Sequence, residues 1–287
     1  MTTPSEPVVA ERRHLVNLAY RLLGSLSEAE DAVQETYARW YALTPAQQDA
    51  ISSPGAWLTT VAGRICLDVL GSARVRRERY VGEWLPEPLP DQTDPADRIT
   101  LDESVSMAFL VALEAMTPAQ RVALVLHDVF GYAFAEVAGI TGRTPAACRE
   151  LASAARRRIR AARPAAPPAR QAALVRDFKQ AWAAGDIDAL IGLLDPGATL
   201  TADGGGRVRA ALAPIEGGEV VARYVADLAG RSHGELTIEE RAVNGRPGLV
   251  LRRGDELAAV YAFAVADDRI THIWAVRNPD KLRPWLG

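Results

Sequence analysis

Two proline-rich stretches constrain the fold of this chain more than any other feature, because proline does not fit inside a helix or a central strand. Residues 80–100 (YVGEWLPEPLPDQTDPADRIT) hold four prolines and five acidic residues. Residues 163–170 (RPAAPPAR) form a second proline break. Both stretches are typical of extended linkers. We therefore expect three folded parts, at residues 8–79, 101–163 and 171–287.

The composition limits the class of protein. The 287 residues are 48% hydrophobic and carry a net charge of −3, although arginines cluster at residues 74–79 and 156–163. This balance argues against a protein that coats DNA by itself, so a partner would have to deliver the chain to DNA. The sequence shows neither a long apolar run nor a secretory pattern, which predicts a cytoplasmic protein without membrane contact. Cys66 and Cys148 fit no metal or redox spacing, which favours reduced core cysteines and no metal site.

The first part is patterned as helices. In SLSEAEDAVQETYARWYAL, Ser27 suits an N-cap ahead of an acidic first turn. Apolar residues at helical spacing predict a buried stripe, made of Ala29, Val33, Tyr37, Trp40 and Tyr41. Glu28, Asp31 and Glu35 share another face, which is either solvated or a docking surface for a basic partner.

A second helix is predicted from SPGAWLTTVAGRICLDVLGSARVRRE, where Ser53 can cap and Pro54 suits the first helical position. Its surface keeps five arginines, namely Arg64, Arg74, Arg76, Arg77 and Arg79. Such a density favours phosphate contacts, with a solvated face as the alternative. Gly71 costs about 1 kcal/mol in a helix interior, so we expect the helix to end or bend there.

Together these two stretches resemble the second conserved domain of bacterial sigma factors of the extracytoplasmic-function type. The resemblance implies that Glu28, Asp31, Gln34 and Glu35 dock on the β′ clamp helices of core RNA polymerase. It also implies that the second helix opens and reads the −10 promoter element by holding an unstacked base. The implied −10 residues are Trp57, Arg64, Arg74, Arg76 and Arg77.

Residues 101–163 carry the pattern of a helix-turn-helix. FAEVAGI predicts a short helix, TGR a tight turn, and Thr144-Pro145 the capped start of another helix. Such motifs place the N-terminal residues of the second helix on base edges in the major groove, although many helical hairpins imitate the pattern. Arg143 and Arg149 suit guanine or phosphate, and the RRRIR end suits phosphates.

This part resembles the −35-reading domain of the same sigma family, so that the resemblance covers about residues 8–163. The implied −35 residues are Arg143, Thr144, Arg149, Glu150, Arg156 and Arg157. The acidic linker at residues 80–100 resembles the family segment that runs along the nucleic-acid channel of polymerase. A solvated spacer is the alternative.

The third part changes pattern from helical to alternating. Strands are predicted at residues 236–243, 248–253, 256–266 and 270–277, with hairpin turns at NGRPG and DDR. We expect an α+β domain with an antiparallel sheet. It resembles the cone-shaped SnoaL-like domain, some of whose relatives are enzymes. Asp203, His233 and His272 are the acid–base candidates, but their spacing supports no pair, so we expect no enzyme, no catalytic residue and no cofactor.

A subgroup of these sigma factors carries such a domain at the C-terminus. This chain resembles that subgroup at three short segments, which are WLPEP (84–88) in the linker, DGGG (203–206) and NPDKL (278–282). The glycine loop lacks the Lys-Ser/Thr and the capped helix of a phosphate cradle. A contact or hinge is favoured instead, with Asp203 and Arg207 as its polar groups. The expected regulatory interface comprises Trp84, Leu85, Pro86, Asp203, Gly204, Gly205, Gly206, Asn278, Pro279 and Asp280.

The resemblance therefore implies a promoter-specificity subunit of bacterial RNA polymerase, active in a stress response, with a fused control domain. Its expected partners are core polymerase and promoter DNA, and an unidentified small ligand could occupy the cone. We expect a monomer. The alternatives are a SnoaL-like small-molecule enzyme or ligand sensor fused to a DNA-binding module, and a regulator that binds DNA without polymerase.

Overall fold

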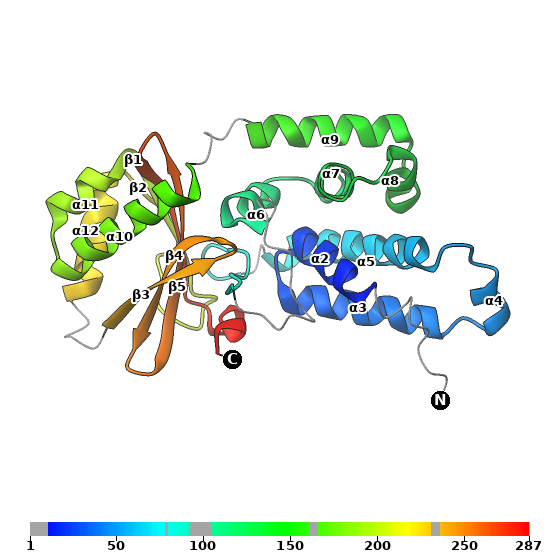
Figure 1. Cartoon of the computed structure of the whole chain (residues 1–287), viewed down its shortest axis with the longest axis horizontal. Helices are drawn as coiled ribbons and strands as arrows, with labels where there is room; N and C mark the ends of the chain where they lie inside the picture. Colours follow the sequence, from blue (N-terminus) through cyan, green and yellow to red (C-terminus); the bar gives the residue numbers. More distant parts are fainter. Residues whose placement is uncertain (1–10, 78–79, 92–104, 161–165, 231–235, 287) are drawn as a thin grey trace. The chain divides into compact units, whose positions relative to one another are not determined.

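The computed structural model describes residues 11–77, 80–91, 105–160, 166–230 and 236–286, and the chain forms two compact units (Figure 1). The helical unit comprises Met1–Glu78, Thr93–Thr100 and Ala112–Ala161. The sheet unit comprises Arg79–Gln92, Leu101–Val111 and Ala162–Gly287. The first half of the proline-rich linker therefore folds with the C-terminal part of the chain. Residues 92–100 of the linker lie outside the described residues.

The helical unit contains the predicted helices, with one cap shifted. Its elements are α2 (Arg12–Leu23), α3 (Leu26–Tyr41), α4 (Pro45–Asp49), α5 (Pro54–Arg77), α7 (Pro118–Leu124), the π-helical turn η2 (Val125–Val129), α8 (Phe134–Thr141) and α9 (Pro145–Arg160). Helix α6 (Met107–Glu114) begins in the sheet unit and ends in the helical unit. The N-cap of α3 is Ser25, whose Oγ accepts from the backbone N–H of Glu28 at 3.3 Å, and not Ser27 as the sequence suggested.

Two further expectations for this unit were wrong. Of the two outcomes expected at Gly71, an end of the helix is wrong, because α5 continues to Arg77 past the turn that holds buried Cys66 and Leu70. Packing of an apolar face outweighs the helix cost of one glycine. The predicted stripe of α3 is buried at Ala29, Val33 and Trp40 only, whereas Tyr41 is 53% exposed.

The helix-turn-helix forms where it was predicted. Gly142 ends α8 in the left-handed region, at φ 64°, which the turn requires and glycine adopts at no steric cost. The Oγ1 of Thr144 then accepts from the N–H of Ala147 at 3.2 Å and caps α9. The N-terminal half of α9 is exposed, while Cys148 and Ala152 are buried on its inner face.

In its described residues, the sheet unit contains three complete helices, the start of α6 and a six-stranded sheet in the order β2-β1-β6-β5-β4-β3. The helices are α10 (Pro168–Ala184), α11 (Ile187–Leu193) and α12 (Gly218–Gly230). The strands are β1 (Leu194–Asp203), β2 (Ile215–Glu216), β3 (Leu236–Val243), β4 (Arg246–Arg253), β5 (Glu256–Ala266) and β6 (Arg269–Val276), followed by the 3-10 turns η3 (Pro279–Lys281) and η4 (Arg283–Trp285). The sheet is mixed, not antiparallel throughout, because β1 pairs parallel with β6.

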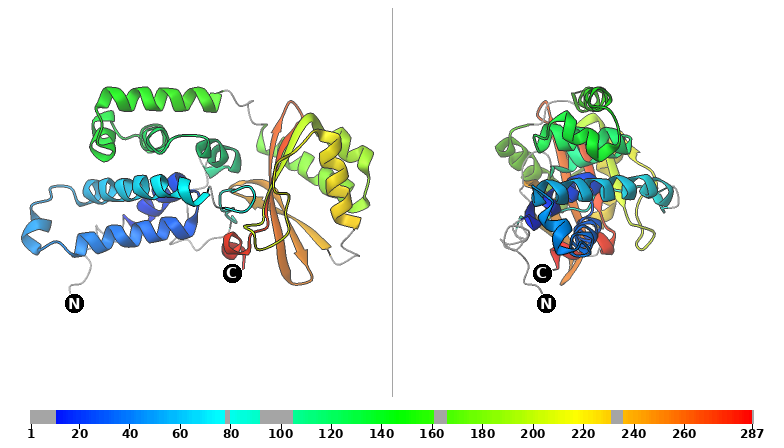
Figure 2. Two further views of the ribbon diagram at one scale, coloured as in Figure 1. Left: turned by 180° about the vertical axis from the view of Figure 1, so that it is seen from behind. Right: turned by 90° about the vertical axis from the view of Figure 1, so that its right-hand side faces the viewer.

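The two faces of this sheet are covered differently (Figure 2). Helices α10, α11 and α12 cover one face over an aromatic core that includes Phe178, Trp182 and Tyr261. The other face packs against the linker and the start of α6, through Leu85, Met107, Val250, Val260, Trp274 and Leu282. The linker therefore occupies an apolar face that the sheet unit would otherwise expose.

Candidate functional site

A fully buried carboxylate lies where the linker meets the sheet. Asp203, the last residue of β1, is 0% exposed. Its Oδ1 accepts from the hydroxyl of Tyr80 at 2.6 Å and from the N–H of Gly205 at 3.0 Å. Its Oδ2 accepts from the backbone N–H of Leu85 at 2.9 Å and from Lys281 Nζ at 2.6 Å. One carboxylate thus holds two points of the linker.

Lys281 completes this arrangement, which we call the Asp203 site (Tyr80, Trp84, Leu85, Asp203, Asn278 and Lys281). Its Nζ also donates to the carbonyl oxygen of Leu85 and lies 4.0 Å from the ring centroid of Trp84. The side chain of Lys281 is only 10% exposed. Removing one partner of such a buried ion pair typically costs about 3–5 kcal/mol, because the other charge stays buried. Both charges lie outside the linker, so its release would leave the ion pair in place and remove the hydrogen bonds that the pair makes to Leu85.

The C-terminal NPDKL segment holds the Asp203 site from the other side. The backbone N–H groups of Arg277 and Asn278 donate to the carbonyl oxygen of Asp203 at 2.8 and 2.9 Å. The Nδ2 of Asn278 donates to the hydroxyl of Tyr80 at 2.8 Å. Burial, followed by the hydrogen bond to Asp203, raises the pKa of Tyr80 well above its usual range. The phenol therefore stays protonated and donates to the carboxylate.

The glycine loop is a close-approach loop. A Cβ on Gly204 would lie 2.3 Å from the carbonyl oxygen of Val208. A Cβ on Gly205 would lie 2.3 Å from Nδ2 of Asn278, and Gly205 has φ +60°. Only glycine avoids both the clash and the backbone strain there. Arg207 forms an exposed ion pair with Asp280 at 3.1 Å, and such pairs contribute little.

A second set of contacts fixes the far end of the linker. Buried Asn244 accepts from the N–H of Leu89 through Oδ1 at 3.1 Å and donates its own N–H to Leu89 O at 2.8 Å. The indole N–H of Trp285 donates to Pro88 O at 2.8 Å. Residues 85–89 are all buried. The described part of the linker is therefore anchored at Tyr80, Leu85, Pro88 and Leu89, and buried backbone groups of Leu85, Pro88 and Leu89 are hydrogen-bonded, as burial requires.

Four anchoring residues were missed from the sequence: Tyr80, Asn244, Lys281 and Trp285. Asn244 was interpreted only as a hairpin turn residue, and its φ of +53° confirms that turn. Lys281 carried a usable signal, because it is one of only two lysines in a chain rich in arginine. A compact ammonium fits a buried single carboxylate where a guanidinium fork does not. The predicted Trp84, Leu85, Asp203, Gly205 and Asn278 do lie together, while Pro279 and Asp280 are exposed at the edge.

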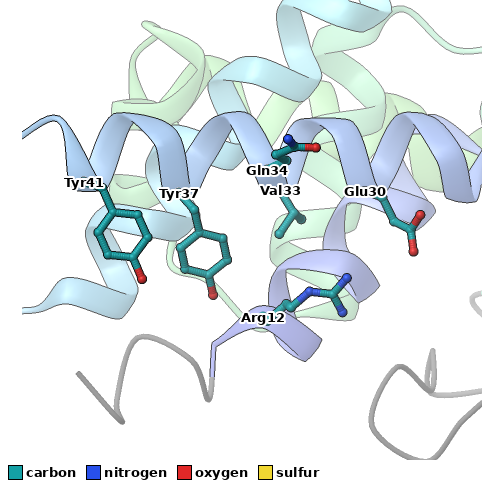
Figure 3. A pocket seen from close by; sticks show the side chains of 6 residues that line it. All are labelled: Arg12, Glu30, Val33, Gln34, Tyr37 and Tyr41. Atoms are coloured by element: carbon teal, nitrogen blue, oxygen red, sulfur yellow. The ribbon is translucent and has the colours of Figure 1, made fainter. Parts of the chain in front are cut away.

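In the helical unit, the predicted polymerase-docking residues share the exposed side of α3. Asp31, Gln34 and Glu35 are exposed, and Glu35 pairs with Arg39 at 2.8 Å. Glu28 is half-buried at the helix start. Beside them lies a groove of about 510 Å³ between α2 and α3 (Figure 3). Its lining residues are Arg12, Glu30, Val33, Gln34, Tyr37 and Tyr41.

The predicted −10 residues lie along α5, but the described ones are already engaged. Half-buried Trp57 packs edge-on against Trp40, with ring centroids 5.3 Å apart. The Nη2 of exposed Arg64 donates to the carbonyl oxygen of Gly139 in α8 at 2.8 Å. The side chains of Arg74, Arg76 and Arg77 lie outside the described residues.

The predicted −35 residues separate into two groups. Arg143, Thr144, Arg149, Glu150 and Arg157 are exposed. Arg156 instead forms a two-point ion pair with Asp128 of η2, at 2.6 and 2.9 Å, which raises the Arg156 pKa. The Nε and Nη2 groups of that guanidinium both bind Asp128, so in this conformation Arg156 holds α9 to η2.

Residues before and after the linker share one core in the helical unit. The hydroxyl of Tyr132 lies 2.9 Å from His14 Nε2 and 3.2 Å from Thr59 Oγ1. Buried Arg121 donates to the carbonyl oxygen of Leu22 at 2.9 Å. A Cβ on Gly63 of α5 would lie 2.8 Å from Ile140 Cγ2 of α8. Helix α5, which carries the predicted −10 residues, is thus packed on α8 of the helix-turn-helix.

The described residues also bear on membrane spans, metal sites and the histidine candidates. None of the helices described is both long enough and apolar enough to span a membrane. No cluster of three or more potential metal-ligating side chains occurs in the described ranges. His272 is exposed and stacks on Trp274, and His233 lies outside the described residues.

Known proteins resemble this chain both in sequence and in fold. A family model of Sigma-70 region 2 matches residues 8–79, and one of Sigma-70, region 4 matches residues 106–159. The chain is 40% identical over 288 residues to the ECF RNA polymerase sigma factor SigJ of Mycobacterium tuberculosis, covering 95% of this chain and 91% of the relative. It is 35% identical over 280 residues to the probable ECF RNA polymerase sigma factor SigI of the same species, covering 96% and 93%.

The crystal structure of M. tuberculosis extracytoplasmic function sigma factor SigJ matches with a TM-score of 0.78 at 36% identity, covering 96% of this chain and 97% of that one. The expected fold is thereby confirmed: two helical sigma domains, the second with a helix-turn-helix, and a C-terminal SnoaL-like α+β domain. The alternative of a fused small-molecule enzyme is not favoured by these relatives. The chain belongs to the extracytoplasmic-function sigma factors and is a promoter-specific sigma factor of RNA polymerase.

Proposed function

We propose that the sheet unit controls this sigma factor by holding residues 80–91 of the linker in the Asp203 site. The observation that carries the proposal is that buried Asp203 and Lys281 both bind Leu85, one at its N–H and the other at its carbonyl oxygen. The linker joins the domains assigned to the two promoter elements. Contacts that hold the linker therefore limit the maximum distance between those two domains.

A length estimate supports this control. The −35 and −10 elements lie roughly 25 base pairs apart by name, which corresponds to about 85 Å along B-DNA. A chain spans at most about 3.3–3.6 Å per residue, so residues 80–91 can supply up to about 40 Å of reach when they are free. That is nearly half of the distance the two domains have to cover, and only the fixed end-to-end span of the segment is left when it is bound. We therefore expect that the linker has to be released before the protein can read both elements at once.

The packing within the helical unit supports the same proposal. Arg64 of α5 contacts Gly139 of α8 directly, at 2.8 Å. Helices in contact cannot each occupy DNA sites tens of ångströms apart. We assign this packing to the protein before promoter binding, and its opening to the formation of the initiation complex. The sheet unit then acts on the same step, because it withholds the length of linker that opening needs.

The remaining residue assignments rest on the family and, where the side chains are described, on their exposure. Asp31, Gln34 and Glu35, with Glu28 and the adjoining groove, form the surface proposed to dock on the β′ clamp helices of core polymerase. The residues proposed to contact the −35 element are Arg143, Thr144, Arg149, Glu150 and Arg157. Trp57, Arg64, Arg74, Arg76 and Arg77 of α5 are proposed to contact the −10 element. The small ligand expected in the cone stays a prediction, and the rings of Phe178, Trp182 and Tyr261 pack against one another there, with centroids 5.2–6.0 Å apart.

The two lysines of the chain offer a matched test. Lys281→Met removes the ammonium from the Asp203 site, whereas Lys179→Met removes one that pairs with Glu240 at the surface, at 3.2 Å. With purified core polymerase, we expect Lys281→Met to raise promoter-specific transcription and to speed proteolytic cleavage within residues 80–91. Lys179→Met is expected to match the wild type in both assays.

Two controls complete the test. Tyr80→Phe removes one hydrogen bond to Asp203 and keeps the buried ion pair, so it gives a milder release if Lys281→Met does not fold. A chain that ends at residue 277 removes the whole NPDKL segment. If all variants transcribe and resist proteolysis like the wild type, the Asp203 site does not control the protein.

A further inference from the structure

Three side chains of the helix-turn-helix form a stack that ends on an exposed arginine. The rings of His127 in η2 and Phe134 in α8 have centroids 3.8 Å apart and an interplanar angle of 24°. The guanidinium carbon of Arg149 in α9 lies 5.3 Å from the centroid of Phe134. The Nδ1 of His127 is 2.8 Å from the carbonyl oxygen of Tyr132, which fixes the imidazole. The Phe134 ring therefore packs between the imidazole of His127 and the guanidinium of Arg149.

This contact differs in kind from those of neighbouring arginines on the same helix. Arg156 is bound at two points by Asp128, and Arg158 donates to the carbonyl oxygen of Ala115. Arg149 has no carboxylate partner in the part of the chain that the structure describes. A guanidinium held over an aromatic ring keeps its charge and its in-plane N–H donors available for another partner.

The place of Arg149 in the fold indicates what that partner is. It is the fifth residue of α9, in the exposed N-terminal half of the second helix of the motif. That half meets base edges in the major groove. Guanine presents two acceptors there, O6 and N7, which match the guanidinium fork. Because the side chain is held before DNA arrives, less rotamer freedom is lost on binding.

We infer that Arg149 reads a single guanine of the upstream promoter element, and that Phe134, supported by His127, is the positioning residue that holds Arg149 for this contact. The inference rests on the proposed role of α9 in reading the −35 element. It goes further by naming the base, the residue that reads it, and an aromatic residue of the other helix that sets the strength of the preference.

The experiment uses the full chain with core polymerase and a set of promoters in which each base pair of the upstream element is changed in turn. The wild type is expected to prefer guanine at one position. Arg149→Ala should reduce the preference at that position about 5- to 150-fold and leave the other positions unchanged. Phe134→Leu should reduce the same preference about 2- to 5-fold. Phe134→Tyr keeps an aromatic ring under Arg149, so this variant should show the same guanine preference as the wild type.

Arg157→Ala is the matched control, since Arg157 is an exposed arginine on the same helix. It is expected to weaken transcription from all templates alike and to lower the salt dependence, as loss of a phosphate contact does. If Arg149→Ala also weakens all templates alike, Arg149 contacts phosphate and the inference is wrong. If Phe134→Leu leaves the base preference intact, Phe134 does not position Arg149. A wild type that is indifferent to the upstream element would instead contradict the proposed role of α9 itself. Circular dichroism melting shows that each variant is folded.

Discussion

At the scale of residues, steric and electrostatic contacts explain why glycines and an aspartate occupy positions 203–206. The three glycines at 204–206 do not cradle a phosphate but allow the backbone to pass close to Val208, Asn278 and Val81. Asp203, first considered as an acid–base candidate, accepts four hydrogen bonds and fixes the linker. Its acceptor capacity is therefore used structurally.

Two glycines with the same backbone strain separate the role of the loop from general stability. Gly205 and Gly254 have φ values of +60° and +56°, but a Cβ on Gly254 meets nothing within 4 Å. Alanine in the left-handed region costs about 1–2 kcal/mol at either position. Only Gly205→Ala also displaces Asn278 from the Asp203 site. We expect Gly205→Ala alone to accelerate amide hydrogen exchange at Leu85, measured by mass spectrometry. Equal exchange in both variants would mean that the loop does not hold the linker.

At the scale of elements, local sequence signals predict the helices and hairpins, but they do not predict which elements pack or pair with one another. The turns at Asn244-Gly245 and Asp267-Asp268 have positive φ at both positions, which is the geometry that tight hairpins require. Strands β3 and β5 have the predicted bounds. The parallel pairing of β1 with β6 was missed, because a short alternating segment carries no record of the direction of its partner.

Helix α5 contains a matched pair of glycines that tests its packing on α8. Gly71→Ala should raise the free energy of unfolding of the helical unit by about 1 kcal/mol, because alanine is the better helix former and its Cβ meets nothing within 4 Å. Gly63→Ala gains the same propensity but forces Cβ into buried Ile140, which typically costs about 1–3 kcal/mol. In urea unfolding, we expect the free energy of unfolding of Gly63→Ala to be lower than that of Gly71→Ala by about that amount. Equal stabilisation by both would show that α5 and α8 are not packed in solution.

At the scale of the whole molecule, the division into units does not follow the division into sequence parts. The sequence predicted an interface between residues 84–86 of the linker and the C-terminal part, with a solvated spacer as the alternative, and the described half of the linker completes the core of the sheet unit. Leu85 and Met107 cover the sheet face that carries Val250, Val260 and Trp274. This arrangement makes the C-terminal domain dependent on a segment that precedes it by more than 70 residues.

That dependence predicts the behaviour of a fragment. Residues 166–287 expressed alone would expose the apolar face around Trp274 and Leu282, and we expect the fragment to self-associate in size-exclusion chromatography. A peptide of residues 80–91 should bind the fragment and reduce its association, whereas the same peptide with Leu85→Asp should do neither. A monomeric fragment that ignores the peptide would show that the linker does not complete this domain.

The sequence by itself determined the helices, the helix-turn-helix and the hairpins. These depend on capping, periodicity and turn residues, which act over a few positions and leave a local pattern. The family was recognised separately, by resemblance of quoted segments. Only the tertiary structure decided that Lys281, Tyr80 and Asn244 hold the linker, that Arg156 is occupied by Asp128, and that α5 lies on α8. The physical reason is that these contacts join residues far apart in the chain, where the gain from burial and pairing depends on the partner and not on the neighbouring sequence.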